Sequence, residues 1–241
     1  MSLTDKIEIP RRTMVLFFLI DTSGSMVGEK IGAVNTAIEE VIPDIREVSG
    51  ENADAQIKIA ALKFSSGVEW LTPKGPIEAD KFRWNYLNVD GLTDLGEAFK
   101  ALNEKLSTKA FMQEATGSFA PAIFLLSDGG PTDNWERHLT TLKQNNWFKA
   151  AVKVAIAIGE DADKDVLKQF TGSAESVLEV HNKAMLKKMI KFVSVRASQI
   201  ASKSSNVGAT SDEAKQQELN ETLQDFANET ANAPDNDQSD W

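Results

Sequence analysis

One junction constrains the fold of this chain more than any other feature: an apolar run of seven residues ends at a carboxylate. The run covers Met14 to Ile20 and is rich in β-branched and aromatic residues, which is typical of a strand buried on both faces. Residues 21–25 follow at once and read Asp-Thr-Ser-Gly-Ser. In an open parallel sheet, ligands bind beyond the carboxyl ends of the strands. The junction therefore predicts a parallel α/β sheet with oxygen-bearing side chains at the end of its first strand.

Strand and helix patterns alternate along the rest of the chain. Apolar runs typical of strands cover 57–64, 122–126, 152–158 and 177–180, and helical periodicity covers about 28–46, the segment from 93, 133–144, 163–170 and 183–201. Residues 68–71 follow a Ser-Ser-Gly turn and are expected to pair with 57–64 as an antiparallel edge. The alternation predicts an α/β fold: a Rossmann-like, doubly wound, mostly parallel sheet with one antiparallel edge strand.

The formal charge of −10 is concentrated in the last part of the chain. Residues 205–241 hold nine acidic residues and one lysine, a net charge of −8, which leaves −2 for the rest. The change in composition predicts a domain over 1–204 and an acidic, largely disordered tail over 205–241. Within the tail, a capping-box pattern begins at Thr210, and apolar residues recur at helical spacing from Leu219 to Phe226. A short amphipathic helix is expected there.

The composition also excludes several classes of function. The chain contains no cysteine, which rules out a disulfide, a thiolate ligand and a cysteine nucleophile and is compatible with a cytoplasmic location. No apolar run approaches the roughly 20 residues that a membrane-spanning helix needs. The nearly balanced charge before residue 205 is not that of a nucleic-acid-binding surface, and the acidic tail would repel phosphate. We therefore expect neither a nucleic acid nor a membrane as a partner.

Oxygen-bearing side chains recur at two further junctions, one before the helix that begins near residue 93 and one after strand 122–126. Because hard divalent cations prefer oxygen ligands, the three junctions together predict a site for Mg²⁺, with Mn²⁺ or Ca²⁺ as alternatives. Their oxygen-bearing side chains include Asp21, Ser23, Ser25, Thr93 and Asp128. An alternative is that the hydroxyls cap the helices that follow them and the acids face solvent. That alternative does not explain why three separate junctions carry oxygen ligands.

Two stretches carry a resemblance to a known family. Residues 19–29 read Leu-Ile-Asp-Thr-Ser-Gly-Ser-Met-Val-Gly-Glu, and residues 127–135 read Ser-Asp-Gly-Gly-Pro-Thr-Asp-Asn-Trp. They resemble von Willebrand factor A (vWA) domains that carry a metal-ion-dependent adhesion site (MIDAS), and among these the TerY-type proteins of bacterial tellurite-resistance and stress operons. The resemblance covers about residues 12–202 and implies the vWA fold. The acidic tail lies outside it.

The resemblance also implies that Asp21, Ser23, Ser25, Thr93 and Asp128 form the metal site, and it gives each of them a role. In such a site, Ser23, Ser25 and Thr93 bind the ion directly, whereas Asp21 and Asp128 act mainly through waters and hold the hydroxyls in place. Neutral hydroxyls leave the ion under-neutralised, so its open position favours a carboxylate. We therefore expect a protein partner that supplies an Asp or a Glu. The TerY resemblance implies partners in a stress-response complex, including phosphatase- and kinase-like operon products.

Several nearby features allow more than one interpretation. Three roles are open to Asp94: its side chain points at the ion, caps the following helix or faces solvent. We expect it to cap the helix. Trp135 forms a rim that a partner touches, or it is the buried anchor of its helix. The acidic tail has two docking sites to choose from, namely the metal face and the lysine-bearing helix around 183–191.

No pattern in the chain indicates catalysis. A nucleophile–base pair, a Gly-x-Ser-x-Gly elbow, a phosphate-binding loop and a dinucleotide-binding fingerprint are all missing from the sequence. A metal-dependent phosphohydrolase of the haloacid-dehalogenase type also begins with a strand-terminal Asp, but it needs a second carboxylate two residues later, where this chain has Ser23. A scaffold with an empty site is a third alternative. We expect a cytoplasmic, metal-dependent protein-binding module that is not an enzyme.

Overall fold

The computed structural model describes residues 11–53, 55–113, 117–128, 130–201 and 212–231. The strands are β1 (Arg12–Asp21), β2 (Ala55–Ser65), β3 (Gly67–Trp70), β4 (Ile77–Glu78), β5 (Ala122–Ser127), β6 (Val152–Ile158) and β7 (Val177–Val180). The helices are α1 (Glu29–Glu51), α2 (Leu95–Lys105), α3 (Trp135–Leu142), α4 (Asn146–Ala150), α5 (Lys164–Thr171), α6 (Lys183–Ala201) and α7 (Asp212–Ala231), with a short 3-10 helix, η1 (Gly24–Met26).

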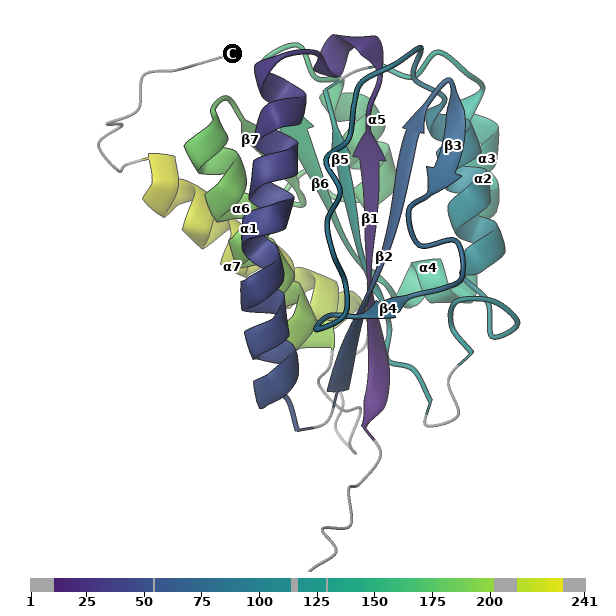
Figure 1. Ribbon diagram of the computed structural model, residues 1–241, viewed down its shortest axis with the longest axis vertical. Coiled ribbons are helices and arrows are strands. Elements are labelled where there is room, and N and C mark those ends of the chain that lie inside the picture. Colours follow the sequence, from purple (N-terminus) through teal and green to yellow (C-terminus); the bar gives the residue numbers. More distant parts are fainter. Residues whose placement is uncertain (1–10, 54, 114–116, 129, 202–211, 232–241) are drawn as a thin grey trace, which may run out of the picture.

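The strands form one sheet in the order β3-β2-β1-β5-β6-β7 (Figure 1). β1 pairs in parallel with β2 and with β5, and β6 and β7 extend the parallel part of the sheet. The predicted Rossmann-like, mostly parallel sheet is confirmed. Both β3 and β4 pair antiparallel to β2, so the sheet has one more antiparallel strand than the sequence predicted. β4 contains two residues, which is too short to produce a recognisable pattern.

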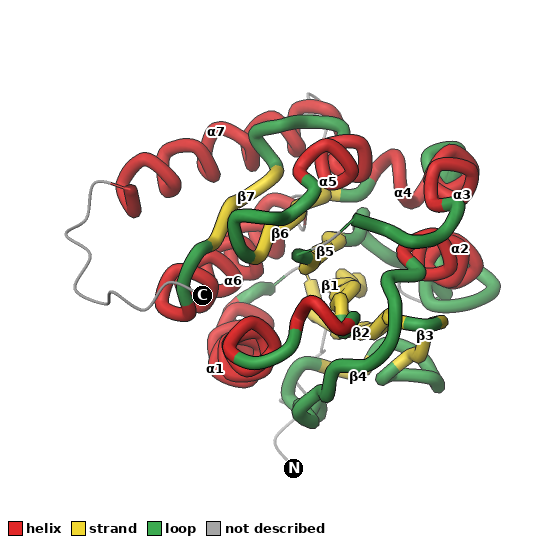
Figure 2. The backbone as a smooth tube through the Cα atoms, turned by 90° about the horizontal axis from the view of Figure 1, so that it is seen from above, coloured by secondary structure: helices red, strands yellow, loops and turns green. Residues whose placement is uncertain are grey.

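The residues of β1 divide the core into two halves. Its even-numbered residues from Met14 to Ile20 lie in the half of the core that α1 and α6 cover, to which α7 adds Leu219 and Leu223. Its odd-numbered residues from Val15 to Leu19 lie in the other half of the core, which α2, α3, α4 and α5 cover (Figure 2). Each large apolar side chain buried in this way contributes about 1.5–3 kcal/mol to folding. The strand is therefore buried on both faces, as its apolar run predicts, and its carboxyl end is held firmly in the middle of the sheet.

Helix α1 begins where the sequence predicts but runs to Glu51, past the expected end near Arg46. The helix continues through Pro43, which has no backbone N–H to donate. Ile42 and Ile45 lie on either side of the proline and are 4% and 1% exposed. Because burial of this apolar face stabilises the helix, it outweighs the loss of one helical hydrogen bond.

Residues 212–231 differ from the expectation of a largely disordered tail. They form helix α7, which is 20 residues long, and Leu219 and Leu223 are both 0% exposed within the core shared with α1 and α6. The side-chain amide of Gln216 also satisfies the backbone of Lys153 in β6: its oxygen accepts from the backbone N–H at 2.9 Å, and its nitrogen donates to the carbonyl oxygen at 3.1 Å. Helix α7 is therefore packed into the domain. The remaining tail segments, 205–211 with the capping-box Thr210 and 232–241, lie outside the described residues.

Candidate metal centre

The predicted site lies at the carboxyl end of the two central strands. Asp21 is the last residue of β1, and Asp128 directly follows the last residue of β5. From β1 the sheet continues to β2 on one side, whereas from β5 it continues to β6 on the other, so the crevice between the two strands is the topological switch point of the sheet. Figure 2 looks down on this edge, where the loops that follow β1 and β5 meet.

Asp21 organises the first loop from a fully buried position, 0% exposed. Its Oδ1 accepts a hydrogen bond from the backbone N–H of Ser23 at 2.8 Å, and its Oδ2 accepts one from the Ser127 hydroxyl at 2.6 Å. Burial raises the pKa of Asp21, the hydrogen bonds from Ser127 and Ser23 partly offset that rise, and the negative charge of Asp128 adds to it. A cation at this edge would stabilise the charged form of Asp21.

The hydroxyls of the first loop converge on Asp128. The Oγ atoms of Ser23 and Ser25 lie 3.1 Å apart, and the Ser25 hydroxyl donates to Oδ1 of Asp128 at 2.8 Å. Ser23 and Asp128 are each 1% exposed, whereas Ser25 lies at the surface. Four of the five predicted site residues are thus joined by one chain of hydrogen bonds from Asp21 to Asp128.

Thr93, the fifth predicted residue, belongs to a loop that the backbone holds against the first loop. The N–H of Asp90 donates to the carbonyl of Thr22 at 2.8 Å, and the N–H of Gly24 donates to the carbonyl of Gly91 at 3.0 Å. Thr93 itself is 5% exposed. The structure therefore places its loop beside the serine hydroxyls without a direct side-chain hydrogen bond to them.

The Pro-Thr-Asp part of the third loop, at 131–133, has a structural role that sequence reasoning missed. The side-chain oxygen of Thr132 accepts from the backbone N–H of Thr93 at 3.1 Å, and the backbone N–H of Thr132 donates to the carbonyl of Thr93 at 2.9 Å. This reciprocal pair joins the second loop to the third. In the sequence, the signal for this role is the position of Thr132 within the stretch 127–135, four residues after Asp128.

Asp133 caps helix α2 from outside, in the role that was expected for Asp94. Its two carboxylate oxygens accept from the backbone N–H groups of Gly96 at 3.0 Å and Glu97 at 3.1 Å, which are free donors in the first turn of the helix. Asp94 stands at the N-cap position, but its side chain makes no capping hydrogen bond and instead accepts from the N–H of Gly67 at 2.7 Å. The expectation that Asp94 caps the helix is thus wrong, because the β2–β3 turn uses its carboxylate.

Trp135 is the buried anchor of its helix, one of the two interpretations left open above. It is 8% exposed and belongs to the core on the α2 side of the sheet. Helices α2 and α3 touch at this point: a Cβ added to Gly96 would lie 2.9 Å from the Cα of Trp135. A side chain at Gly96 would therefore displace the loop that carries Thr132 and Asp133.

Lys30 is a site neighbour that sequence reasoning missed. Its ammonium nitrogen lies 2.7 Å from Oδ2 of Asp128 and 3.1 Å from Oδ1 of Asp161, and its side chain is 14% exposed beside the fully buried Asp128 carboxylate. Burial lowers the pKa of Lys30, but the hydrogen bonds to Asp128 and Asp161 outweigh burial and hold that pKa above its ordinary value. Gly159, with φ of +88°, leaves space for the Lys30 side chain, because a Cβ at position 159 would lie 3.0 Å from Cε of Lys30. Asp161 follows the end of β6, a strand-end signal like the three that were used.

The donor set fits a divalent cation bound largely through hydroxyls. Two serine oxygens lie together, a buried threonine stands in the neighbouring loop, and two buried carboxylates hold the arrangement in place. Within the described ranges, no group of three or more His, Cys, Asp or Glu side chains comes together as a metal-binding cluster. A zinc site of the thiolate or imidazole type is therefore absent from this part of the chain, and the hydroxyl-based site is the candidate.

Comparison with known families and structures identifies the kind of domain. The family model for the von Willebrand factor type A domain matches residues 16–192. A search of curated proteins returned no match. In the described part of the chain, no helix has both the length and the apolar character needed to cross a membrane.

Solved structures with the same fold come from distant sources. Proximal thread matrix protein 1 from the mussel byssus shares 19% identity at a TM-score of 0.58, over 78% of this chain and 48% of its own. A von Willebrand factor type A protein from Catenulispora acidiphila shares 17% identity at a TM-score of 0.57, over 77% of this chain and 43% of its own. The ArnB paralog VWA2 from Sulfolobus acidocaldarius shares 20% identity at a TM-score of 0.55, over 77% of this chain and 45% of its own. The chain thus matches less than half the length of each. A further form of the mussel protein, 17% identical at a TM-score of 0.57 over 78% and 48%, has a zinc-occupied MIDAS motif.

Proposed function

The chain belongs to the von Willebrand factor type A domain family, and from this premise we propose that it is a metal-dependent protein-binding module. One observation carries the proposal: hydrogen bonds join the Ser23 and Ser25 hydroxyls and the buried Asp128 carboxylate at the switch point of the sheet. Ser23, Ser25 and Thr93 would hold Mg²⁺ directly, and Asp21 and Asp128 would position them. The bound ion supplies an electrophilic position that accepts an oxygen atom from a partner.

The charges around the site favour a carboxylate as that oxygen. Asp21 and Asp128 bring two negative charges, and Lys30, ion-paired with Asp128, brings one positive charge. These three side chains therefore contribute −1, and a divalent ion changes the sum to +1. One Asp or Glu from a partner restores neutrality, whereas a neutral ligand leaves a partly buried charge uncompensated. Asp161 is left out of this sum because its side chain is 71% exposed and solvent screens it.

Exposed apolar side chains on two of the site loops support a protein rather than a small molecule as the partner. Val27, directly after η1, is 65% exposed, and Leu92, directly before Thr93, is 60% exposed. Apolar side chains beside a polar centre are typical of protein-interaction surfaces. We propose that the partner presents its carboxylate on a segment with apolar neighbours that contact Val27 and Leu92.

The finer assignment rests on the sequence of the third loop. The resemblance of residues 127–135 to TerY-type proteins supports an adaptor role in a cytoplasmic tellurite-resistance or stress-response complex, with phosphatase- or kinase-like operon products as partners. We also propose that the chain is not an enzyme, because the carboxylate that a phosphohydrolase needs two residues after Asp21 is replaced by Ser23. Phosphatase and esterase turnover should stay at background with Mg²⁺ or Mn²⁺. Metal-dependent turnover that disappears in Asp21→Asn would contradict this part of the proposal.

The binding proposal is tested by capture of operon partners on the immobilised chain. Partners should bind with Mg²⁺, elute with a chelator and fail to bind the Ser23→Ala/Ser25→Ala variant. Ser107→Ala serves as the matched control, because Ser107 follows the far end of α2 and should bind like the wild type. Equal capture by the double variant and the wild type would remove the metal centre from the interaction.

A further inference from the structure

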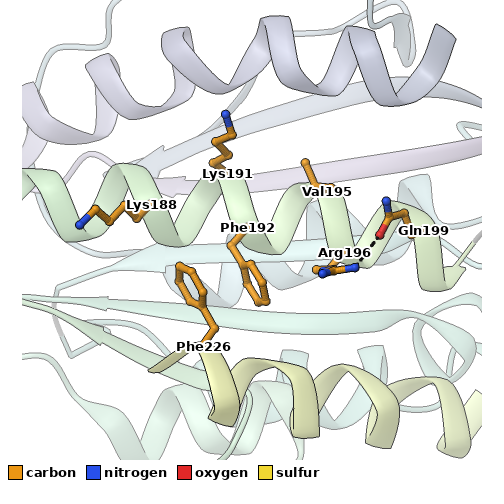
Figure 3. Close-up of a pocket in the computed structure, with 7 residues that line it drawn as sticks. All are labelled: Lys188, Lys191, Phe192, Val195, Arg196, Gln199 and Phe226. Atoms are coloured by element: carbon orange, nitrogen blue, oxygen red, sulfur yellow. Dashed lines mark hydrogen bonds between the residues drawn. The ribbon is translucent and has the colours of Figure 1, made fainter. Parts of the chain in front are cut away.

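A groove of about 430 Å³ lies between α6 and α7, outside the metal centre. Its apolar lining comes from Phe192 and Val195 of α6 and Phe226 of α7, and Lys188, Lys191 and Arg196 stand around it (Figure 3). The three apolar residues are half-buried and the three cationic ones are exposed. The groove thus combines an apolar floor with a positively charged surround.

Two stacked rings form the middle of the groove. The ring centroids of Phe192 and Phe226 lie 3.9 Å apart at an interplanar angle of 6°, so the two helices meet there through aromatic side chains. Both rings are only half-buried, which leaves part of their apolar area open to solvent. Because aromatic pairs gain energy beyond the area that they bury, a further aromatic side chain suits this floor.

The basic residues around the groove differ in whether they have a carboxylate partner. Lys191 pairs with Asp44 of α1 at 2.9 Å. Lys188 and Arg196 make no ion pair with any described residue, and the Arg196 guanidinium donates to the side-chain oxygen of Gln199 at 3.2 Å. The charges of Lys188 and Arg196 therefore remain available to carboxylates of another molecule.

The spacing of these two cations selects a particular ligand. Lys188, Phe192 and Arg196 follow one another at intervals of four residues, so they form one row along α6. Eight residues of helix correspond to about 12 Å. In an extended peptide, residues two before and two after a central one lie on the same side as that residue and are about 13 Å apart. An acid-x-aromatic-x-acid sequence in extended form therefore matches the row.

We propose that the groove between α6 and α7 binds an extended segment of a protein partner with the sequence acid-x-aromatic-x-acid. The aromatic ring of the partner packs against Phe192 and Phe226, and the flanking carboxylates pair with Lys188 and Arg196. The formal charge of −10 on this chain disfavours a nucleic acid in the same groove. None of the groove residues belongs to the metal centre, so this second binding surface does not depend on the proposed metal-dependent function.

The test titrates the isotope-labelled full chain with the peptide Ser-Gly-Asp-Ser-Trp-Ser-Asp-Gly-Ser, monitored by NMR. A chelator is present throughout, because peptide carboxylates would otherwise compete for metal at the other site. Backbone amide signals of α6 from Lys188 to Gln199 should shift, and those of α3 should not. The matched control peptide, Ser-Gly-Ser-Asp-Trp-Asp-Ser-Gly-Ser, has the same composition but turns its carboxylates away from the tryptophan side, so it should bind at least about fivefold more weakly.

Charge-swap variants show whether the carboxylates bind at the two cations. Lys188→Glu/Arg196→Glu should weaken binding at least about tenfold, and a peptide with lysine in place of both aspartates should bind this variant more tightly than it binds the wild type. Lys109→Glu/Lys143→Glu makes the same change of charge at exposed lysines beyond the ends of α2 and α3, and it should bind like the wild type.

Three results would overturn the proposal. The first is an α6 whose signals stay in place at millimolar peptide. The second is equal affinity of the two isomeric peptides or of the two double variants, since the register and the cations would then not matter. The third is a shift of the α6 signals with chain concentration in the absence of peptide, since the occupant would then be a second copy of this chain.

Discussion

Lys30→Met is the substitution that most sharply tests the electrostatics of the metal centre. In the structure, the Lys30 ammonium is the only cation within ion-pair distance of the Asp128 carboxylate among the described residues, at 2.7 Å. Met keeps the apolar stem and removes the charge. The variant therefore leaves a fully buried carboxylate without its partner as long as no metal is bound.

The structure sets the size of the effect. Removing one partner of a buried ion pair costs about 3–5 kcal/mol, and the partial exposure of Lys30 places this pair near the lower limit. For a domain of this size, about 1 kcal/mol corresponds to a Tm change of about 2–4 °C, so the variant should melt about 6–12 °C below the wild type in a chelator. The affinity for Mg²⁺ should change in the opposite direction. Without the repelling ammonium, the variant should bind the ion at least about tenfold more tightly than the wild type, which corresponds to about 1.4 kcal/mol.

Differential scanning calorimetry in a chelator and isothermal titration with Mg²⁺ measure the two quantities separately. Lys30→Arg keeps the charge and should behave like the wild type in both. Lys164→Met removes a more exposed ion pair, with Glu179, and should change the Tm little. If Lys30→Met is as stable as the wild type in the chelator and binds Mg²⁺ with unchanged affinity, Lys30 does not balance the charge of Asp128 and the charge argument for a carboxylate partner is refuted.

Three further predictions concern the surroundings of the site and the packing of α7. Asp133→Ala removes the cap of α2 and should lower the free energy of unfolding by about 1 kcal/mol, measured by calorimetry. Titration should also show weaker Mg²⁺ binding, because the neighbouring Thr93 loop loosens. Leu223→Ala should cost about 2–5 kcal/mol by chemical denaturation, whereas Leu92→Ala, at an exposed position, should stay within about 0.5 kcal/mol; equal small losses would show that α7 is not packed. Burial raises the pKa of Asp21, so a proton competes with the metal there, and the Tm gain from Mg²⁺ should shrink as the pH falls from neutral toward that pKa; a gain independent of pH would contradict the role of Asp21.

The sheet was predictable because its strands are buried on both faces. A residue inside β1 or β5 contacts core on either side, so each position has to be apolar and the run is conspicuous in the sequence. Strand β4 pairs over two residues and leaves no such pattern. Helix α7 was underestimated for a different reason: it combines acidic and amide side chains with few apolar ones, a composition typical of disorder. Its place in the domain depends on Leu219 and Leu223 and on the Gln216 amide that pairs with β6, and neither contact is visible in the composition.

The site shows the same division. Side chains directly after the strands were predictable, because a parallel sheet brings strand ends together, and the structure joins Asp21, Ser23, Ser25 and Asp128 by hydrogen bonds. Lys30 reaches Asp128 from the first turn of α1 across 98 residues of sequence, so no local pattern announces the pair. The exchange of roles between Asp94 and Asp133 was equally hidden, since both acids precede a helix and only the three-dimensional arrangement decides which one caps α2.

The most direct test of the central claim is a crystal structure of the chain grown with Mn²⁺, with the ion located by its anomalous scattering. The account predicts one strong anomalous peak at the carboxyl ends of β1 and β5, bounded by the hydroxyl oxygens of Ser23, Ser25 and Thr93. A well-ordered crystal at saturating Mn²⁺ with no peak at this position would contradict the account. So would a crystal in which the peak lies at Asp161 while Lys30 is still bound to Asp128.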